Sequence, residues 1–195
     1  MKKLDMLISQ LSKLPGIGPK SAERIAYYIA KLPQSEIEAL AASILSVKEG
    51  VYVCKICCNY SEAPICSICS DENRDKGTIC VVKEPQDIAA IERLNIYKGS
   101  YHVLGGVISA KRNKRPQDLC IEELIERIKS NNVREVILAI DPDVEGEMTM
   151  NYLSQLLKGY NLKVSRISIG IPAGGEIEYA DNITLTEAFF GKKEI

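Results

Sequence analysis

Four cysteines are spaced so that they could bind a metal ion. They are Cys54, Cys57, Cys66 and Cys69, in the pattern C-x2-C-x8-C-x2-C. Two such pairs in one short segment supply four soft ligands, which is the donor set that a tetrahedral Zn²⁺ ion takes. We therefore expect a structural zinc ion that folds a segment too small to fold alone. A redox C-x2-C pair is the alternative, and the presence of two pairs at this spacing disfavours it.

Three further cysteines lie outside this pattern. Cys58 could compete with Cys57 as a ligand, although Cys57 fits the spacing better, and we expect Cys80 and Cys120 to be core residues. The total of seven is odd and no signal peptide precedes the first helix, which indicates a reducing compartment and a cytoplasmic protein. No stretch approaches the ~20 apolar residues that a membrane span needs, so we expect no membrane association.

Carboxylates follow two predicted strands in the part of the chain after the cysteines. Glu84 comes after the first of these strands, and Asp141, Asp143 and Glu145 come after the strand at 134–140. Ligands of open α/β sheets bind at the carboxyl ends of strands, where such oxygens could hold Mg²⁺ and polarise a phosphodiester. The alternative is that 141–145 forms a turn that caps the following helix. No Tyr, Ser or His is placed as an evident nucleophile.

A glycine-rich turn near the N-terminus could contact phosphate. The sequence Gly-Ile-Gly-Pro-Lys at 16–20 separates two short helical segments, and the second helix begins directly after it. The N–H groups and dipole of a helix N-terminus favour an anion. Lys20 and Arg24 lie one turn apart and would grip a nucleic-acid backbone without reading bases. The alternative is an ordinary helical hairpin with a glycine turn.

The charge distribution supports a local rather than a global attraction to nucleic acid. The 195 residues carry a formal net charge of −1, and 46% of them are hydrophobic, which argues against disorder. Residues 1–31 hold six cations and only two anions, which suits phosphate contacts or simply a solvated helix face. A second basic segment, 111–115 (KRNKR), suits an exposed phosphate-contacting loop or a merely solvated one.

Three helices should carry and surround the glycine turn. Apolar residues at helical spacing predict an amphipathic helix over 3–13, and Pro19 fits the first turn of a second helix that runs to about residue 32. A third helix is predicted from Ser35 to Val47, with Ser35 and Glu38 forming a capping box. The metal-binding segment then spans about 52–74.

The remainder alternates between strand and helix patterns. Strands are predicted at 78–83, 101–104, 134–140 and 163–169, and helices at 85–94, 120–129 and 146–157. This order predicts a parallel sheet covered by helices on both faces. The tail, 174–190, is expected to form a short strand, a turn and a helix.

Several strings of residues resemble the bacterial RecR family of recombination proteins, over nearly the whole chain. Besides the four-cysteine cluster, they are 14–22 (LPGIGPKSA), 69–75 (CSDENRD), 79–82 (ICVV), 101–106 (YHVLGG), 144–149 (VEGEMT) and 170–181 (GIPAGGEIEYAD). The resemblance implies an α/β multidomain protein with a helix-hairpin-helix region (1–50), a four-cysteine zinc finger (51–75), a Toprim domain (76–170) and a C-terminal Walker-B-like strand and helix for oligomerisation (171–195).

The resemblance also implies a function. RecR-like proteins are not enzymes. They form homotetrameric rings that can encircle DNA, single- or double-stranded and without sequence preference. They act with RecO and RecF at the nucleoid to load RecA onto DNA coated by single-strand-binding protein. By position, the family's DNA contacts fall on Lys20 and Arg24, and its Toprim acids, associated with partner and metal contacts, fall on Glu84 and Glu145.

One departure from the family keeps a second hypothesis open. The family often has Asn-Pro-Thr where this chain has Asp141-Pro142-Asp143, and the intact acids resemble those of Toprim enzymes. The alternative function is therefore a small Mg²⁺-dependent Toprim nuclease that uses Glu84, Asp141, Asp143 and Glu145. A third hypothesis is a purely structural partner-binding module, in which Lys20 and Arg24 do not affect DNA affinity.

Overall fold

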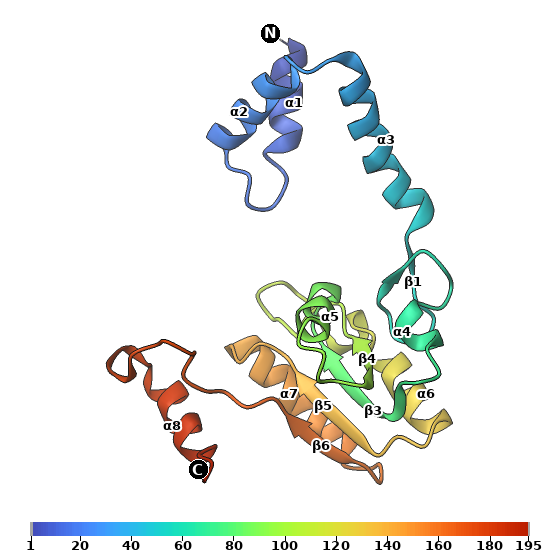
Figure 1. The fold of residues 1–195 in the computed structure, drawn as a ribbon, viewed down its shortest axis with the longest axis vertical. Coiled ribbons are helices and arrows are strands. Elements are labelled where there is room, and N and C mark those ends of the chain that lie inside the picture. Colours follow the sequence, from blue (N-terminus) through green and yellow to red (C-terminus); the bar gives the residue numbers. More distant parts are fainter. Residues whose placement is uncertain (1, 195) are drawn as a thin grey trace. The chain divides into compact units, whose positions relative to one another are not determined.

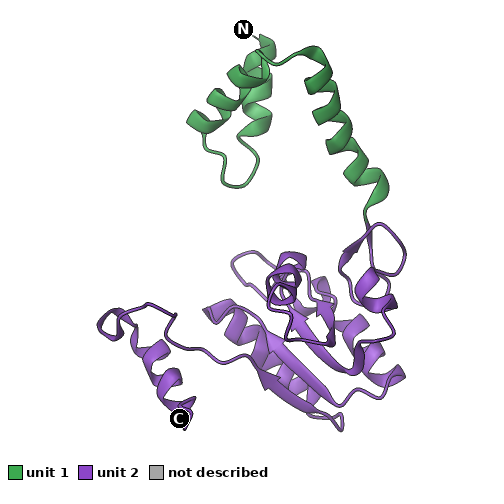
Figure 2. Cartoon of the chain, viewed as in Figure 1, with its two compact units in different colours: residues 1–51 green, residues 52–195 purple. Residues whose placement is uncertain are grey.

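The computed structural model describes residues 2–194, and these divide into two compact units with a boundary between residues 51 and 52 (Figure 2). The finer division into four segments stays a prediction. None of the helices between residues 2 and 194 combines the length and the hydrophobicity of a membrane span.

The first unit consists of three helices. They are α1 (Lys2–Leu11), α2 (Pro19–Ile29) and α3 (Gln34–Gly50) (Figure 1). Helices α1 and α2 pack against each other, and the small side chains of Ala22 and Ala26 are fully buried in this unit. The two helices are where the hydrophobic periodicity predicts them.

The predicted capping box of α3 is wrong. The helix begins at Gln34, with Pro33 as its N-cap at φ −56°, and no side chain caps it. Ser35 therefore lies inside the first turn, and Glu38 accepts a hydrogen bond from the Gln34 amide at 2.9 Å instead. The N-cap is thus two residues earlier than the serine signal indicates, at Pro33, whose ring fixes φ near the helical value.

The second unit begins with the cysteine-rich segment. It contains a two-stranded antiparallel sheet, β1 (Tyr52–Val53) and β2 (Tyr60–Ser61), followed by the short helix α4 (Ser67–Ser70). Few apolar side chains pack around this segment besides the cysteines themselves. Its order therefore depends on what links the sulfur atoms.

A four-stranded parallel sheet follows, as predicted. Its spatial order is β4-β3-β5-β6, so the chain starts at a central strand and crosses over. The strands are β3 (Asp75–Val82), β4 (Gly99–Val103), β5 (Glu135–Ala139) and β6 (Lys163–Arg166). The helices are α5 (Pro85–Glu92), α6 (Ile121–Ser130) and α7 (Val144–Leu157), and a 3-10 turn (Pro116–Asp118) precedes α6.

Alternate residues of β3 belong to two different cores. Ile79 and Val81 pack with the buried residues of α6 and α7, whereas Cys80 and Val82 pack with Ile88 of α5. All four β3 residues are at most 3% exposed. A strand buried on both faces reads as a continuous apolar run, which is why the sequence predicts this strand well. The predicted α/β class is confirmed.

The tail differs from the prediction. It contains a 3-10 turn (Ile177–Tyr179) and the helix α8 (Asn182–Phe190), and the expected short strand is absent from residues 170–194. A strand forms only where another strand pairs with its backbone, and the order of this sheet ends at β6. Arg166 links the tail to the sheet through ion pairs with Glu147, at 3.0 Å, and Glu187, at 2.7 Å.

Candidate functional sites

The turn between α1 and α2 has an open and uncapped helix start. Gly16 has a φ of +79°, a conformation that favours glycine, and an added Cβ would meet no atom within 4 Å. Gly18 is the N-cap of α2 and Pro19 its first helical residue, and no side chain caps the helix. The first N–H groups of α2 thus keep hydrogen-bonding capacity for an external acceptor.

Lys20 and Arg24 lie on the first turns of α2. Both side chains are exposed, and neither forms an ion pair or hydrogen bond with another side chain among residues 2–194. Two free cations one helical turn apart, next to uncapped N–H groups, form a surface that can receive phosphate oxygens. The geometry thus permits the contact that the sequence predicts, and their role in binding DNA stays a prediction.

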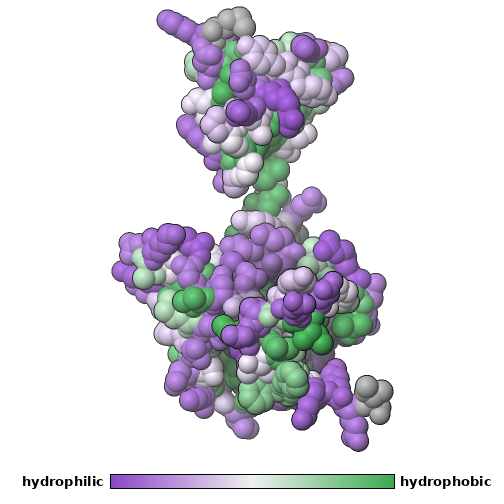
Figure 3. Space-filling model, turned by 90° about the vertical axis from the view of Figure 1, so that its left-hand side faces the viewer, coloured by the Kyte–Doolittle hydropathy of each residue, from purple (hydrophilic) through white to green (hydrophobic). Residues whose placement is uncertain are grey.

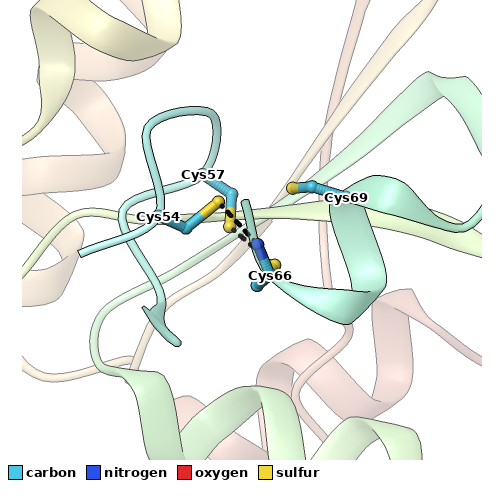
Figure 4. A group of neighbouring side chains, drawn as sticks. All are labelled: Cys54, Cys57, Cys66 and Cys69. Atoms are coloured by element: carbon cyan, nitrogen blue, oxygen red, sulfur yellow. Dashed lines mark hydrogen bonds between the residues drawn. The ribbon is translucent and has the colours of Figure 1, made fainter. Parts of the chain in front are cut away.

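The four predicted zinc ligands converge (Figure 4). Cys54 and Cys57 come from the loop between β1 and β2, Cys66 is the N-cap residue of α4, and Cys69 lies within α4. Their sulfur atoms all lie within 4.8 Å of one another, and the Cys57 and Cys66 sulfurs are 3.6 Å apart. A zinc ion with Zn–S bonds of about 2.3 Å separates its ligands by about 3.8 Å, so the cluster fits this ion.

Burial makes this sulfur cluster depend on a cation. Cys54 and Cys57 are each 1% exposed. The hydrogen bond between the Cys57 and Cys69 side chains raises the pKa of Cys57, to which burial adds, and lowers the pKa of Cys69. Four thiolates at this spacing repel one another, so a bound Zn²⁺ would supply the compensating charge and hold both halves of the finger together.

Cys58 does not take part in this cluster. It has a φ of +60° and packs against the sheet core that includes Tyr101 and Val103, with Cys120 beside it. The four-cysteine cluster forms without Cys58. The alternative that Cys58 competes with Cys57 for the zinc ion is therefore not supported.

Two of the four predicted acids cap helices. Glu84 is the N-cap of α5 and forms a reciprocal capping box with Asp87. Asp143 is the N-cap of α7 and accepts a hydrogen bond from the Gly146 N–H at 2.7 Å. An added Cβ at Gly146 would clash with the Asp141 carbonyl oxygen, so the tight turn requires glycine here. The capping alternative for 141–145 therefore holds for Asp143, and Glu84 serves as a cap that the sequence did not indicate.

The other two acids pair with cations of the same chain. Asp141 forms a 2.8 Å ion pair with Lys83, and this carboxylate raises the pKa of Lys83. Glu145 accepts a hydrogen bond from the Ser109 hydroxyl and forms an ion pair with Arg112. The hydrogen bond from Ser109 lowers the pKa of Glu145 most, and the contact with Arg112 lowers it further.

The four acids do not form one ion site among the described residues. The groups of three or more His, Cys, Asp or Glu side chains whose ligand atoms converge within 4.8 Å include neither Glu84 nor Asp141, Asp143 or Glu145. The parallel strands bring the acids to one edge of the sheet, as predicted, but each carboxylate already has its own partner. Mg²⁺ binding at this edge stays a hypothesis.

Sequence reasoning missed the partners of these acids. Lys83 directly follows β3, whose last residue pairs with the last residue of β5, so the sheet register places it near Asp141. Strand pairing could have indicated this contact. Ser109 and Arg112 lie in an irregular loop, and no periodicity signals where such a loop folds.

The predicted basic loop is largely engaged within the chain. Arg112 pairs with Glu145, Arg115 pairs with Asp118, and Lys114 donates to the Gly105 carbonyl. Lys111 is exposed. The loop therefore closes over the acidic edge and offers fewer free cations than its composition indicates.

Comparison with protein families covers most of the chain in four consecutive segments. Residues 4–48 match the helix-hairpin-helix of RecR, and 51–71 match the RecR zinc finger domain with four cysteines. Residues 77–168 match the Toprim domain, and 170–193 match the C-terminal segment of RecR. The zinc finger match coincides with the converging cysteines.

Several curated proteins similar to this chain carry the name "Recombination protein RecR". The protein of Bifidobacterium adolescentis is 50% identical over 192 residues, covering 98% of this chain and 96% of the relative. That of Rippkaea orientalis is 50% identical, covering 98% and 97%. That of a Cyanothece species is 45% identical over 198 residues, covering 100% and 97%.

Proposed function

This chain belongs to the RecR family of recombination proteins, and from this premise we propose that it binds DNA through α2 and acts without cutting it. The family assigns it a recombination-mediator role in DNA repair, and the predicted family and fold class are confirmed. The family match and the buried four-cysteine cluster also support zinc binding.

The free cations of α2 carry the DNA-binding proposal. Lys20 and Arg24 are exposed and unpaired among the described residues, whereas Arg112, Lys114 and Arg115 of the basic loop have internal partners. Contacts from α2 to phosphate would be independent of sequence, because they do not reach base edges.

Salt-dependent DNA binding tests this proposal. Replacing Lys20 and Arg24 together by Ala should weaken binding to all sequences alike. It should also flatten the plot of log affinity against log salt, by roughly one unit for each phosphate that α2 no longer neutralises. Fluorescence anisotropy with labelled single- and double-stranded oligonucleotides at several salt concentrations measures both effects.

A matched control removes the same charge elsewhere. Lys129 and Lys158 are exposed residues of the second unit, and replacing both by Ala changes the net charge equally. An equal loss of affinity in this control would point to net charge rather than to a site on α2. An unchanged salt slope in the Lys20 and Arg24 variant would support the structural-module hypothesis.

The acidic edge supports a role without catalysis. Glu84 and Asp143 cap helices, and Asp141 and Glu145 pair with Lys83 and Arg112. We expect the purified protein to leave supercoiled plasmid intact in the presence of Mg²⁺. Nicking that disappears in an Asp141→Asn, Asp143→Asn variant would establish the nuclease alternative instead.

We further propose a homotetrameric ring that acts with RecO and RecF at the nucleoid to load RecA. Exposed apolar side chains on α3 and α8 support self-association, and apolar patches interrupt the hydrophilic surface (Figure 3). A single chain offers few free cations, so one copy should bind DNA weakly. Several copies on one DNA act at high effective concentration, which raises avidity by roughly 10²–10⁴.

A further inference from the structure

A second cluster of metal-ligating side chains lies outside the four-cysteine site. It consists of Cys58, Cys120 and Glu123, whose ligand atoms all lie within 4.8 Å of one another. We propose that these three residues bind a second thiophilic divalent cation, Zn²⁺ or a similar ion, which ties the zinc finger to the start of α6.

The donor set suits such an ion. Two thiolates and one carboxylate give three protein ligands and leave one position of a tetrahedron for water or another small ligand. With Zn–S bonds of about 2.3 Å and Zn–O bonds of about 2.1 Å, neighbouring ligand atoms lie about 3.5–3.8 Å apart. The three side chains need only small adjustments to reach this spacing. Binding releases the two thiol protons to solvent, so the occupied site has a charge of about −1.

The start of α6 brings two of the ligands together. Cys120 is the N-cap of α6 and Glu123 is the third helical residue. Side chains at these two positions face each other in any capping box. In α6 no side chain caps the helix, so both remain available to a metal ion. The helix dipole favours negative charge at this end.

The third ligand comes from the zinc finger. Cys58 is at φ +60°, a conformation that few residues other than glycine adopt. In this conformation it packs beside Cys120 and stays out of the four-cysteine cluster, although it directly follows Cys57. Two neighbouring cysteines thus serve two different groups of ligands.

Backbone hydrogen bonds fix both ligand-bearing segments to the end of β4. The Val103 N–H donates to the Cys57 carbonyl at 2.8 Å, and the Cys120 N–H donates to the Leu104 carbonyl at 3.0 Å. The Cys120 carbonyl accepts from Nε2 of His102 at 2.6 Å. Residues 102–104 therefore hold the finger and the start of α6 in place, and the ligands are positioned before a metal ion arrives.

The carboxylate member of the cluster faces solvent. Glu123 is exposed and lines a pocket of about 390 Å³ together with Lys55, Cys69 and Arg127. The proposed site therefore has ligands of fitting type, a fitting spacing, fixed backbones and one ligand open to solvent.

Zinc stoichiometry of the full chain tests the proposal. The protein is purified with reductant, loaded with Zn²⁺ and freed of excess, and bound zinc is measured by mass spectrometry of the metal. We expect about two ions per chain in the wild type and about one in Cys120→Ser and in Glu123→Gln. Cys80→Ala and Glu122→Gln, which change residues outside the cluster, should keep about two.

Cobalt provides a second readout. Replacing Zn²⁺ by Co²⁺ produces a thiolate-to-metal charge-transfer band whose intensity follows the number of sulfur ligands. Cys120→Ser should lower this band, whereas Glu122→Gln should not. Because Glu123 is exposed, Glu123→Gln should fold even if Cys120→Ser does not.

Two results would overturn the proposal. One is a single bound ion in the wild type, with Cys58 and Cys120 alkylated by iodoacetamide while Zn²⁺ is present. The other is an intact mass that shows a Cys58–Cys120 disulfide in protein purified without reductant, together with no second ion bound after full reduction and reloading with Zn²⁺. Neither result bears on DNA binding by α2.

Discussion

At the scale of single residues, carboxylates that could bind Mg²⁺ have structural partners. Asp143 is the clearest case, because its side chain accepts from the Gly146 N–H at the first turn of α7. A cap needs only a side-chain oxygen, whereas a divalent cation needs the charge of a carboxylate. The two roles therefore respond differently to the loss of charge.

Substitutions at Asp143 separate these roles. Asp143→Ala should lower the free energy of unfolding by about 1 kcal/mol, because α7 loses its cap. Asp143→Asn should retain most of that stability, since an amide oxygen accepts the same hydrogen bond. Urea unfolding followed by circular dichroism measures both variants. Equal destabilisation by Ala and Asn would indicate that the charge, and not the cap, matters.

His102 is the only histidine of the chain and is fully buried in β4. Its Nε2 bonds to the Cys120 carbonyl, which leaves Nδ1 unprotonated and without a hydrogen-bond partner. Burial lowers the pKa of His102 to about 4, against the partly compensating bond to Cys120. The folded state therefore disfavours the charged imidazole.

Stability should depend on pH through this residue. The unfolded chain takes up the proton near pH 6.5 and the folded chain only near pH 4, so stability is full above about pH 6.5. As the pH falls between these values, the free energy of unfolding should decrease by about 1.4 kcal/mol per pH unit. Below about pH 4, His102 causes no further decrease. Acid also releases zinc, so the wild type is compared with His102→Gln. A constant difference between the two across about pH 7.5 to 4.5 would contradict the prediction.

At the scale of elements, the turn before α2 depends on one backbone conformation. Gly16 has a positive φ and Gly18 does not, although an added Cβ would find open space at both positions. The two glycines look equivalent in the sequence, and the structure separates them. Only the first is required for the shape of the turn.

Alanine substitutions test this difference. Gly16→Ala should destabilise the hairpin by roughly 1 kcal/mol, because a Cβ disfavours the left-handed conformation. Gly18→Ala should add at most roughly a few tenths of a kcal/mol of backbone strain. Hydrogen exchange of the α2 amides measures the local effect. Equal exchange rates in both variants would contradict it.

At the scale of the whole molecule, two helices among the described residues expose large apolar side chains. Helices α3 and α8 bury no residues, although both contain large apolar side chains. On α8, Phe189 and Phe190 are 69% and 83% exposed. Large apolar side chains that are exposed next to one another on a folded protein mark a surface that contacts another molecule.

Self-association should therefore depend on α8. Replacing Phe189 and Phe190 by Ser should lower the mass in solution measured by light scattering, because each buried Phe stabilises an interface by roughly 1.5–3 kcal/mol. Ile96→Ser is the control, since Ile96 is 78% exposed but lies in the loop between α5 and β4. An unchanged mass in the double variant would place the interface elsewhere.

Local sequence patterns were sufficient to predict most of the helices and strands and the four zinc ligands. Buried parallel strands are apolar throughout, and zinc ligands have a fixed spacing, so local pattern is enough to recognise Ile79 to Val82 and the four cysteines. The strand predicted in the tail did not form, because a strand near residue 177 requires another strand to pair with its backbone. The amino-acid types of the segment alone do not provide that partner.

The partners of individual polar side chains, in contrast, depend on the tertiary fold. Lys83 and Arg112 neutralise acids that lie 58 and 33 residues away in the chain, and Cys120 at the start of α6 meets Cys58 of the zinc finger. Such contacts arise from strand register and loop folding, which leave no periodic trace in the sequence. Local physics thus specified which elements form, and packing specified which charges and thiols face one another.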